Sequence, residues 1–137
     1  MMTKLEIAAL YAGINILLLL VLAVRVTMAR RANKVSFGDG GNPAVLRAMR
    51  AHGNAAEFIP AALVALFFMA WLDAVPLWAM HVLGGGFTLG RLSHAYAVTT
   101  YQGPPPGPGR AFGMLLTWAA YLCFGLLLIW SATGARM

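Results

Sequence analysis

The feature that most constrains this chain is its first apolar stretch, which runs from about Leu5 to Met28. A helix needs about 20 mostly apolar residues to cross a bilayer, so this stretch is long enough to span one. Four strongly polar residues interrupt it: Glu6, Asn15, Arg25 and Thr27. A cleaved signal peptide is the alternative, but the apolar part is too long for one, and residues 29–31 do not form a typical cleavage site.

The composition of the whole chain excludes several classes of protein. Of its 137 residues, 61% are hydrophobic and only 10% are charged, whereas ordinary soluble domains are about 25% charged. An ordinary soluble globule is therefore unexpected, and intrinsic disorder is excluded because disordered chains are poor in large apolar residues. The single cysteine, Cys123, excludes a disulfide scaffold. With three histidines and no clustered ligand spacing, we expect no metal site.

Turn signals divide the rest of the chain into three further helices. Asn42-Pro43 is a typical helix start, with an N-cap followed by a proline in the first turn. Residues 73–76 form a tight turn, and the prolines of segment 99–109 exclude a helix there. We predict one domain over residues 1–137, an all-α integral membrane four-helix bundle of left-handed up-down topology. Its spanning helices cover approximately residues 5–29, 43–72, 76–98 and 110–133.

The basic residues predict the orientation of these helices in the membrane. Six of the ten lie in or beside the first loop: Arg25, Arg30, Arg31, Lys34, Arg47 and Arg50. By the positive-inside rule, loops one and three are cytoplasmic and both termini are periplasmic in a bacterial inner membrane. In a eukaryote, the endoplasmic reticulum would follow the same logic. The net charge of +6 therefore indicates membrane topology, and we expect no nucleic-acid partner.

Polar residues inside the second helix need a reason, because a charge deep in a spanning helix costs about 2.5–3.5 kcal/mol. Arg50, Asn54 and Glu57 are separated by four and three residues, so they share one helix face. Arg47 extends this face toward the cytoplasm and could simply snorkel. The stripe either locks helix packing as a structural ion pair or offers a cation, an amide and a carboxylate to a ligand.

Two further positions carry polar groups that a ligand could use. Arg91 and His94 share a face of the third helix, where Arg91 could pair with Glu57 or hold an anion. An interhelical hydrogen bond without a ligand is the alternative reading of His94. Arg110 begins the fourth helix and is either a binding group or an anchor at the membrane edge. Together with Arg30 or Arg31, these residues suit a ligand with two or more carboxylates or phosphates.

Packing in this small bundle is expected to depend on small residues and on contact between subunits. Gly86-x-x-x-Gly90 has the spacing that permits close helix contact. We place Trp118 inside the bundle, and we expect Cys123 to be a buried, inert thiol because no base lies nearby in the sequence. Four short helices enclose little volume, so a site of this size is expected to lie between subunits of an oligomer.

The segment Arg50–Pro60 reads Arg-Ala-His-Gly-Asn-Ala-Ala-Glu-Phe-Ile-Pro. It resembles the Arg-Ala-His-x-Asn-x-x-Glu-x-x-Pro signature of the MAPEG family, the membrane-associated proteins in eicosanoid and glutathione metabolism. The resemblance covers nearly the whole chain, since Ala29-Arg30-Arg31 ends the first helix as in that family. Gly90–Tyr96 is similar to the third-helix segment of its bacterial branch, and Arg110 has a counterpart at the start of the fourth helix.

The resemblance implies a homotrimer in membrane lipid that binds glutathione as co-substrate between neighbouring subunits. Arg110 is implied to be catalytic, because it would face the glutathione sulfur and stabilise the thiolate, the nucleophilic form. The second substrate would be an apolar electrophile or a lipid hydroperoxide that enters from the lipid. The residues implied to bind glutathione or line its site are Arg30, Arg50, Asn54, Glu57, Arg91 and His94.

Departures from the family pattern narrow the expected function. Gly53 takes a place that is basic in some members, and Val98 stands where eicosanoid-synthesising members often have tyrosine. Ala111 follows Arg110 at a place where one synthase branch has a hydroxyl, so eicosanoid synthesis is not expected. A glutathione-dependent transferase or peroxidase is the leading hypothesis. A non-catalytic protein that binds lipid or glutathione is the second. A small transporter or channel subunit is the third, but the outer halves of helices one, three and four show no comparable polar track.

Overall fold

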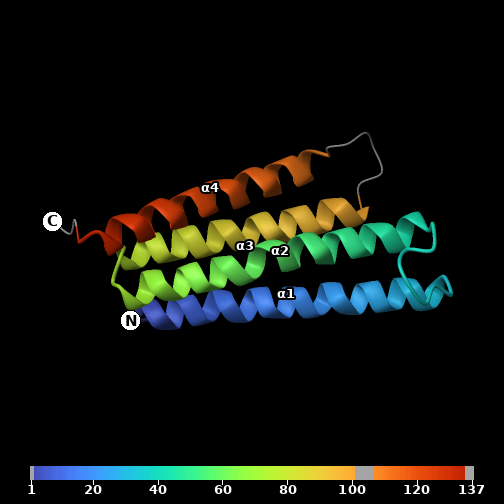
Figure 1. The fold of residues 1–137 in the computed structure, drawn as a ribbon, viewed down its shortest axis with the longest axis horizontal. Helices are drawn as coiled ribbons and strands as arrows, with labels where there is room; N and C mark the ends of the chain where they lie inside the picture. The colour runs from blue at the N-terminus through green and yellow to red at the C-terminus, as the bar shows by residue number, and fades with distance from the viewer. Residues whose placement is uncertain (1, 101–106, 135–137) are drawn as a thin grey trace.

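A computed structural model of the protein describes residues 2–100 and 107–134. This part of the chain forms four α-helices and no strand: α1 (Lys4–Ala32), α2 (Pro43–Trp71), α3 (Leu77–Thr100) and α4 (Pro108–Ala132). The α1–α2 connection, the end of α3 and the start of α4 lie at one end of the molecule, and the start of α1 and the end of α4 lie at the other (Figure 1). The predicted all-α, up-down four-helix architecture is confirmed.

The helix starts follow from local capping chemistry. Thr3 and Glu6 form a reciprocal capping box at the start of α1, with the Thr3 amide donating to the Glu6 carboxylate at 2.7 Å. Asn42 caps α2 through its side-chain oxygen, which accepts from the Ala44 amide at 2.9 Å. Pro108 opens α4 two residues earlier than predicted, since proline suits the first helical turn. The proline run at 104–106 lies outside the described residues.

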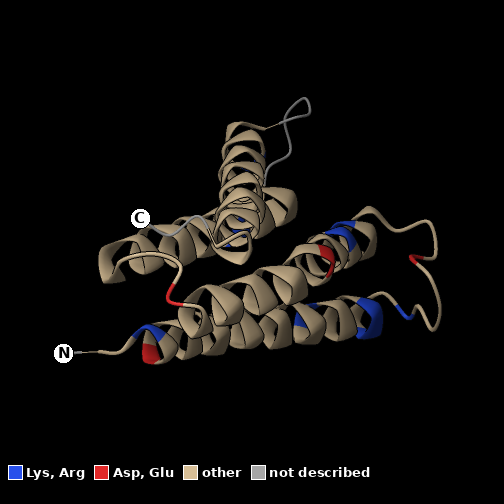
Figure 2. Ribbon diagram, turned by 60° about the vertical axis from the view of Figure 1, so that its left-hand side comes forward, with Lys and Arg blue, Asp and Glu red and all other residues tan. Residues whose placement is uncertain are grey.

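The outer surface of the bundle is apolar, as a lipid environment requires. Helices α1, α2 and α4 are long and apolar enough to cross a membrane by length and composition. We predicted four such helices, and α3 falls short because it carries glycines, two histidines and Arg91. Three polar residues of α3 are buried, Thr88, Arg91 and His94, whereas His81 is exposed. Figure 2 shows basic residues concentrated at the end of the bundle that holds the α1–α2 connection.

Helix α3 approaches both α4 and α1 closely at glycines. The glycines involved are not the Gly86 and Gly90 pair that the sequence suggested. An added Cβ at Gly113 of α4 would lie 2.6 Å from the Gly90 carbonyl oxygen of α3. At Gly84, an added Cβ would lie 2.3 Å from the Tyr11 ring of α1. Gly86, in contrast, has no atom within 4 Å of that position, so it does not take part in the close contact. Gly113 is therefore the partner of Gly90.

The fourth helix turns a different side to the bundle from the one we predicted. Its buried residues are Gly113, Thr117, Ala120, Phe124 and Ser131. This stripe places Trp118 and Cys123 on the outer side, where Trp118 is 53% exposed and Cys123 is also exposed. The predictions of a packed Trp118 and a buried Cys123 are wrong for the single chain, because the close contact at Gly113 fixes the rotation of α4 about its own axis.

We predict that replacing Gly113 with alanine destabilises the protein. Backbone atoms of α3 occupy the space that the new methyl group needs, and overpacking of this kind costs about 1–3 kcal/mol. Thermal denaturation of the detergent-purified protein, followed by circular dichroism, measures the effect. Gly125→Ala, on the same helix, is the control because nothing lies within 4 Å of its added Cβ. Equal midpoints for the two variants would contradict the close contact.

Candidate functional site

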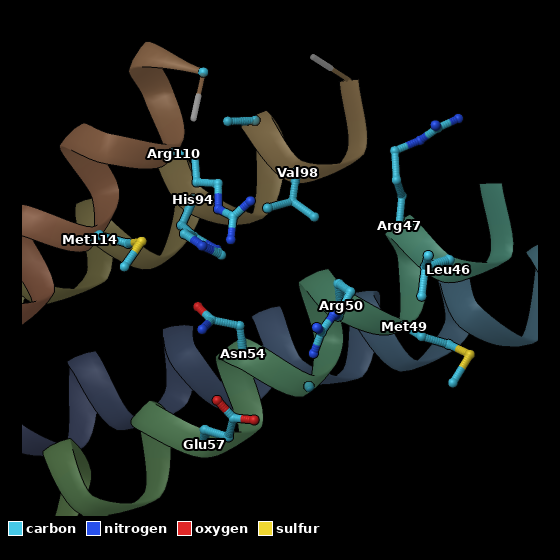
Figure 3. A pocket seen from close by; sticks show the side chains of 13 residues that line it. Leu46, Arg47, Met49, Arg50, Asn54, Glu57, His94, Val98, Arg110 and Met114 are labelled. Carbon is cyan, nitrogen blue, oxygen red and sulfur yellow. The ribbon is translucent and has the colours of Figure 1, made fainter. Parts of the chain in front are cut away.

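A cavity of about 770 Å³ lies between α2, α3 and the start of α4. It is open on one side, and Figure 3 shows the side chains that line it. The lining parts of α3 and α4 are the end of α3 and the start of α4, which lie at the same end of the molecule as the α1–α2 connection (Figure 1). Thirteen residues line it: Leu46, Arg47, Met49, Arg50, Gly53, Asn54, Glu57, His94, Ala97, Val98, Gly107, Arg110 and Met114.

The wall formed by α2 carries the polar stripe that the sequence predicted. Arg47, Arg50, Asn54 and Glu57 all line the cavity. They are separated by three, four and three residues, which is the spacing of one helix face. In Figure 3 these side chains project from successive turns of α2. The prediction that Arg50, Asn54 and Glu57 share one face is therefore confirmed.

The opposite wall comes from α3 and α4, and a hydrogen bond fixes the two helices together there. The Ser93 hydroxyl donates to the Gly109 carbonyl oxygen at 2.9 Å, which holds the start of α4 against α3. This contact brings Arg110 beside His94, and both line the cavity (Figure 3). His94 is only 4% exposed, whereas Arg110 is exposed. A buried imidazole and an exposed guanidinium therefore face the polar stripe of α2.

The charges around the cavity do not cancel. Three guanidinium groups and one carboxylate line it: Arg47, Arg50, Arg110 and Glu57. In the part of the chain that the structure describes, the ion pair found is that of Lys4 with Asp73, which joins the start of α1 to the α2–α3 connection. Glu57 thus has no arginine within ion-pair distance among those residues. Such a cavity suits a ligand with several anionic groups and one cationic group.

Arg91 is not among the residues that line this cavity, and among the described residues it does not form the ion pair with Glu57 that the sequence suggested. Its side chain is buried behind Asn54, where Nη1 donates to Asn54 Oδ1 at 2.7 Å. Nη2 donates to the Thr117 hydroxyl and to the Gly113 carbonyl oxygen of α4. The guanidinium therefore joins α3 to both α2 and α4, and it reaches the cavity only through Asn54.

Arg30 also lies apart from this cavity within the single chain. Its Nε donates to the Gly38 carbonyl oxygen at 3.2 Å, and its Nη2 lies 3.6 Å from Met49 Sδ. Arg30 lines a separate open cleft of about 470 Å³ at the end of α1. That cleft is also lined by Thr27, Arg31, Lys34, Val35 and Ser36. Five of the seven predicted site residues therefore come together: Arg50, Asn54, Glu57, His94 and Arg110.

Several lining residues were not identified from the sequence, although helical spacing would have found them. Ala97 and Val98 follow His94 by three and four residues, and Met114 follows Arg110 by four. Positions three and four apart on a helix are neighbours, so each extends the face of a polar residue already identified. These apolar residues give the cavity a less polar wall beside its arginines. Gly53 leaves room within it, since nothing lies within 4 Å of an added Cβ.

Comparison with known proteins identifies relatives along most of the chain. The profile described as the MAPEG family matches residues 8–130. The inner membrane protein YecN of Escherichia coli strain K12 is 35% identical over 126 residues, covering 90% of this chain and 91% of the relative. YecN of Escherichia coli O6:H1 strain CFT073 gives the same identity and coverage. No solved structure matches the chain.

The cavity predicts a clear difference in thiol accessibility between two surfaces. In a Cys123→Ser background, Val98→Cys should react readily with a water-soluble, negatively charged thiol reagent, because it faces a cationic cavity. Leu122→Cys is the control, since residue 122 is exposed on the apolar outer side of α4 and should be covered by lipid. Mass spectrometry of the intact protein in membrane vesicles measures both rates.

The same labelling tests the predicted topology. If the cavity end is cytoplasmic, Val98→Cys should react faster in inside-out vesicles than in right-side-out vesicles. Faster labelling in right-side-out vesicles would reverse the assignment of loops and termini. Equal labelling of Val98→Cys and Leu122→Cys would contradict a water-accessible cavity.

Proposed function

The chain belongs to the MAPEG family, and from this premise we propose that it is a membrane-bound, glutathione-dependent transferase or peroxidase. Its second substrates would be apolar electrophiles or lipid hydroperoxides. Because its relative YecN is an inner membrane protein, we place the activity in a bacterial inner membrane. The observation that carries the proposal is the open cationic cavity lined by Arg50, Asn54, Glu57, His94 and Arg110.

The charge pattern of this cavity is complementary to glutathione. Glutathione carries two carboxylates, one ammonium group and one thiol. Arg47 and Arg50 would hold carboxylate groups, since guanidinium groups bind carboxylates with paired hydrogen bonds. Glu57 would bind the ammonium group, because it is the one carboxylate among the lining residues. The cavity volume of about 770 Å³ lies within the usual range of small-molecule sites, roughly 300–1,000 Å³.

Arg110 would supply the chemical activation. A cation close to a thiol favours its deprotonated form, and the thiolate is the nucleophile. With an electrophile, the thiolate sulfur would attack the electrophilic carbon and form a carbon–sulfur bond while the leaving group departs with its electron pair. With a lipid hydroperoxide, the sulfur would attack the terminal oxygen and break the oxygen–oxygen bond. The lipid alkoxide would leave and take a proton from water to become the alcohol, and a second glutathione thiol would convert the sulfenic acid into glutathione disulfide and water.

The position of the cavity supports this use of two very different substrates. It lies at the predicted cytoplasmic end of the bundle, on the side where glutathione keeps thiols reduced. The neighbouring surface of α4 is apolar, with Phe112, Leu115 and Trp118 all exposed. An apolar substrate dissolved in the bilayer could reach the cavity along this surface. Arg30 would join the site from a neighbouring subunit of a homotrimer, because within one chain it lies in the separate cleft.

A non-catalytic protein that binds glutathione or lipid is the second candidate, and one observation favours it. The Arg110 side chain is exposed, and no residue in the described ranges makes a hydrogen bond with its guanidinium. An activating group that is not held in place stabilises a developing charge less well. In this candidate, the same cavity would bind its ligand without forming a thiolate.

Titration with glutathione distinguishes these candidates. We expect the detergent-purified protein to bind glutathione and to give the ultraviolet difference band of a thiolate. Arg110→Ala should remove that band while weakening binding by no more than about tenfold, or about 1.4 kcal/mol, because the other polar groups remain. Arg25→Ala is the matched control, since it removes the same charge from an exposed position on α1.

The outcomes separate the hypotheses cleanly. A thiolate band that Arg25→Ala keeps and Arg110→Ala loses supports the activated-thiol enzyme and justifies a screen of electrophiles. Binding without a thiolate band supports the non-catalytic candidate. Absence of glutathione binding in the wild-type protein contradicts the glutathione assignment in both candidates and leaves the polar stripe with a structural or lipid-binding role.

A further inference from the structure

The most unusual group in the protein is a buried guanidinium that lies just behind the cavity. Arg91 is 2% exposed, although its side chain is charged and α3 is surrounded by apolar residues. Within the described residues its polar contacts are all with neutral groups: Asn54 of α2 and Gly113 and Thr117 of α4. Its guanidinium carbon also lies 5.0 Å from the centre of the Phe58 ring. Burying a charge inside a membrane-spanning bundle is energetically costly, so a functional role is expected for this guanidinium.

The contact with Asn54 determines how that amide is oriented. A guanidinium can only donate hydrogen bonds, so the amide atom 2.7 Å from Arg91 Nη1 must be the oxygen. The amide nitrogen then lies on the other side of the group. Asn54 lines the cavity, and no residue in the part of the chain that the structure describes accepts a hydrogen bond from its Nδ2. Both Nδ2 hydrogens therefore remain available to a ligand.

Arg91 is itself held so that it cannot easily turn away. The Thr117 hydroxyl donates to the Gly113 carbonyl oxygen at 2.8 Å, so its lone pairs are left to accept from Arg91. The close approach of Gly90 and Gly113 keeps α4 at the distance this contact requires. The Tyr121 hydroxyl donates to the Phe58 carbonyl oxygen, which ties α4 to α2 next to Arg91. If the Asn54 amide were flipped, its NH2 group would face the Arg91 guanidinium, and no hydrogen bond could form because both groups are donors.

We infer that Arg91 is a positioning residue, which acts on the ligand through Asn54. It fixes the amide so that the cavity is offered an N–H donor and not a carbonyl acceptor. Asn54 would then bind an oxygen acceptor, a carboxylate or an amide carbonyl, and would reject an ammonium group. This inference rests on the proposed function, for which glutathione supplies both kinds of acceptor. It assigns to Arg91 a task different from direct contact with the ligand.

Asn54→Asp tests the donor. Aspartate has nearly the same shape and keeps an oxygen for Arg91, so the fold should be preserved, but an oxygen replaces the amide nitrogen at the cavity. Glutathione affinity, measured by isothermal titration calorimetry, should fall by about tenfold to a hundredfold, the usual effect of a charge-assisted hydrogen bond. Gly53→Asp is the matched control, because it adds a carboxylate to the same cavity wall without removing a donor. Its loss should be smaller.

Arg91→Lys and its combination with Asn54→Asp test the positioning. Lysine keeps the charge but lacks the planar fork that contacts three partners, so the single variant should bind glutathione about tenfold more weakly. If Arg91 acts through Asn54, the double variant should bind no more weakly than Asn54→Asp alone. Additive losses would overturn the inference, because they would show that Arg91 acts by another route.

A second pair of variants covers the case in which Arg91→Lys does not fold. Thr117→Val removes the hydroxyl that holds Nη2, while Thr117→Ser keeps it, and residue 117 does not line the cavity. Weaker glutathione binding in Thr117→Val than in Thr117→Ser supports positioning, and equal binding overturns it. If the wild type binds glutathione but Asn54→Asp binds as well as the wild type, the inference fails and the proposed function stands. If the wild type does not bind glutathione, both fail.

Discussion

The rest of the structure depends on how the bundle accommodates the buried guanidinium of Arg91. A charge inside a membrane-spanning bundle is tolerated only when polar partners replace its water. Here those partners belong to α2 and α4, so satisfying Arg91 requires three helices to hold fixed distances and rotations. Its Nε finds no partner among the described residues, which leaves the desolvation of this group incompletely offset. The interaction therefore specifies one arrangement of the helices at some cost in stability.

The cavity is a consequence of that arrangement. Helix α4 packs closely on α3 at Gly90 and Gly113, and among the described residues none of its Cα atoms lies within 8 Å of a Cα atom of α1. The start of α4 is consequently separated from α2, and the cavity lies between them. The polar face of α2 lies opposite Arg110 across this opening (Figure 3). Arg91 lies behind the cavity and Arg110 lies in it, so one cation organises the site while the other is available to a ligand.

The different positions of Arg91 and Arg110 explain why the cavity wall keeps polar groups that are not paired with one another. Between α1 and α3, buried polar groups are paired with each other: the Asn15 amide nitrogen donates to the Thr88 hydroxyl at 2.8 Å, while Asn15 Oδ1 has no partner among the described residues. Those of the cavity wall are not paired with one another, although Glu57 and three arginines line the same space. A purely structural network would bring such charges together. Their separation favours a ligand that carries the complementary charges itself.

The sequence alone determined the four helices and the polar face of α2, because apolar length, capping residues, proline and the 3.6-residue period act locally along the chain. Of the seven site residues predicted from the sequence, five line the same cavity: Arg50, Asn54, Glu57, His94 and Arg110. Only the tertiary structure decided that Arg91 contacts Asn54 and not Glu57, that Arg30 lies in another cleft, and that Trp118 and Cys123 face outward. These outcomes depend on the rotation of each helix about its axis and on which helix lies beside it. Contacts between distant residues, such as that of Gly90 with Gly113, set both, and no local pattern encodes them.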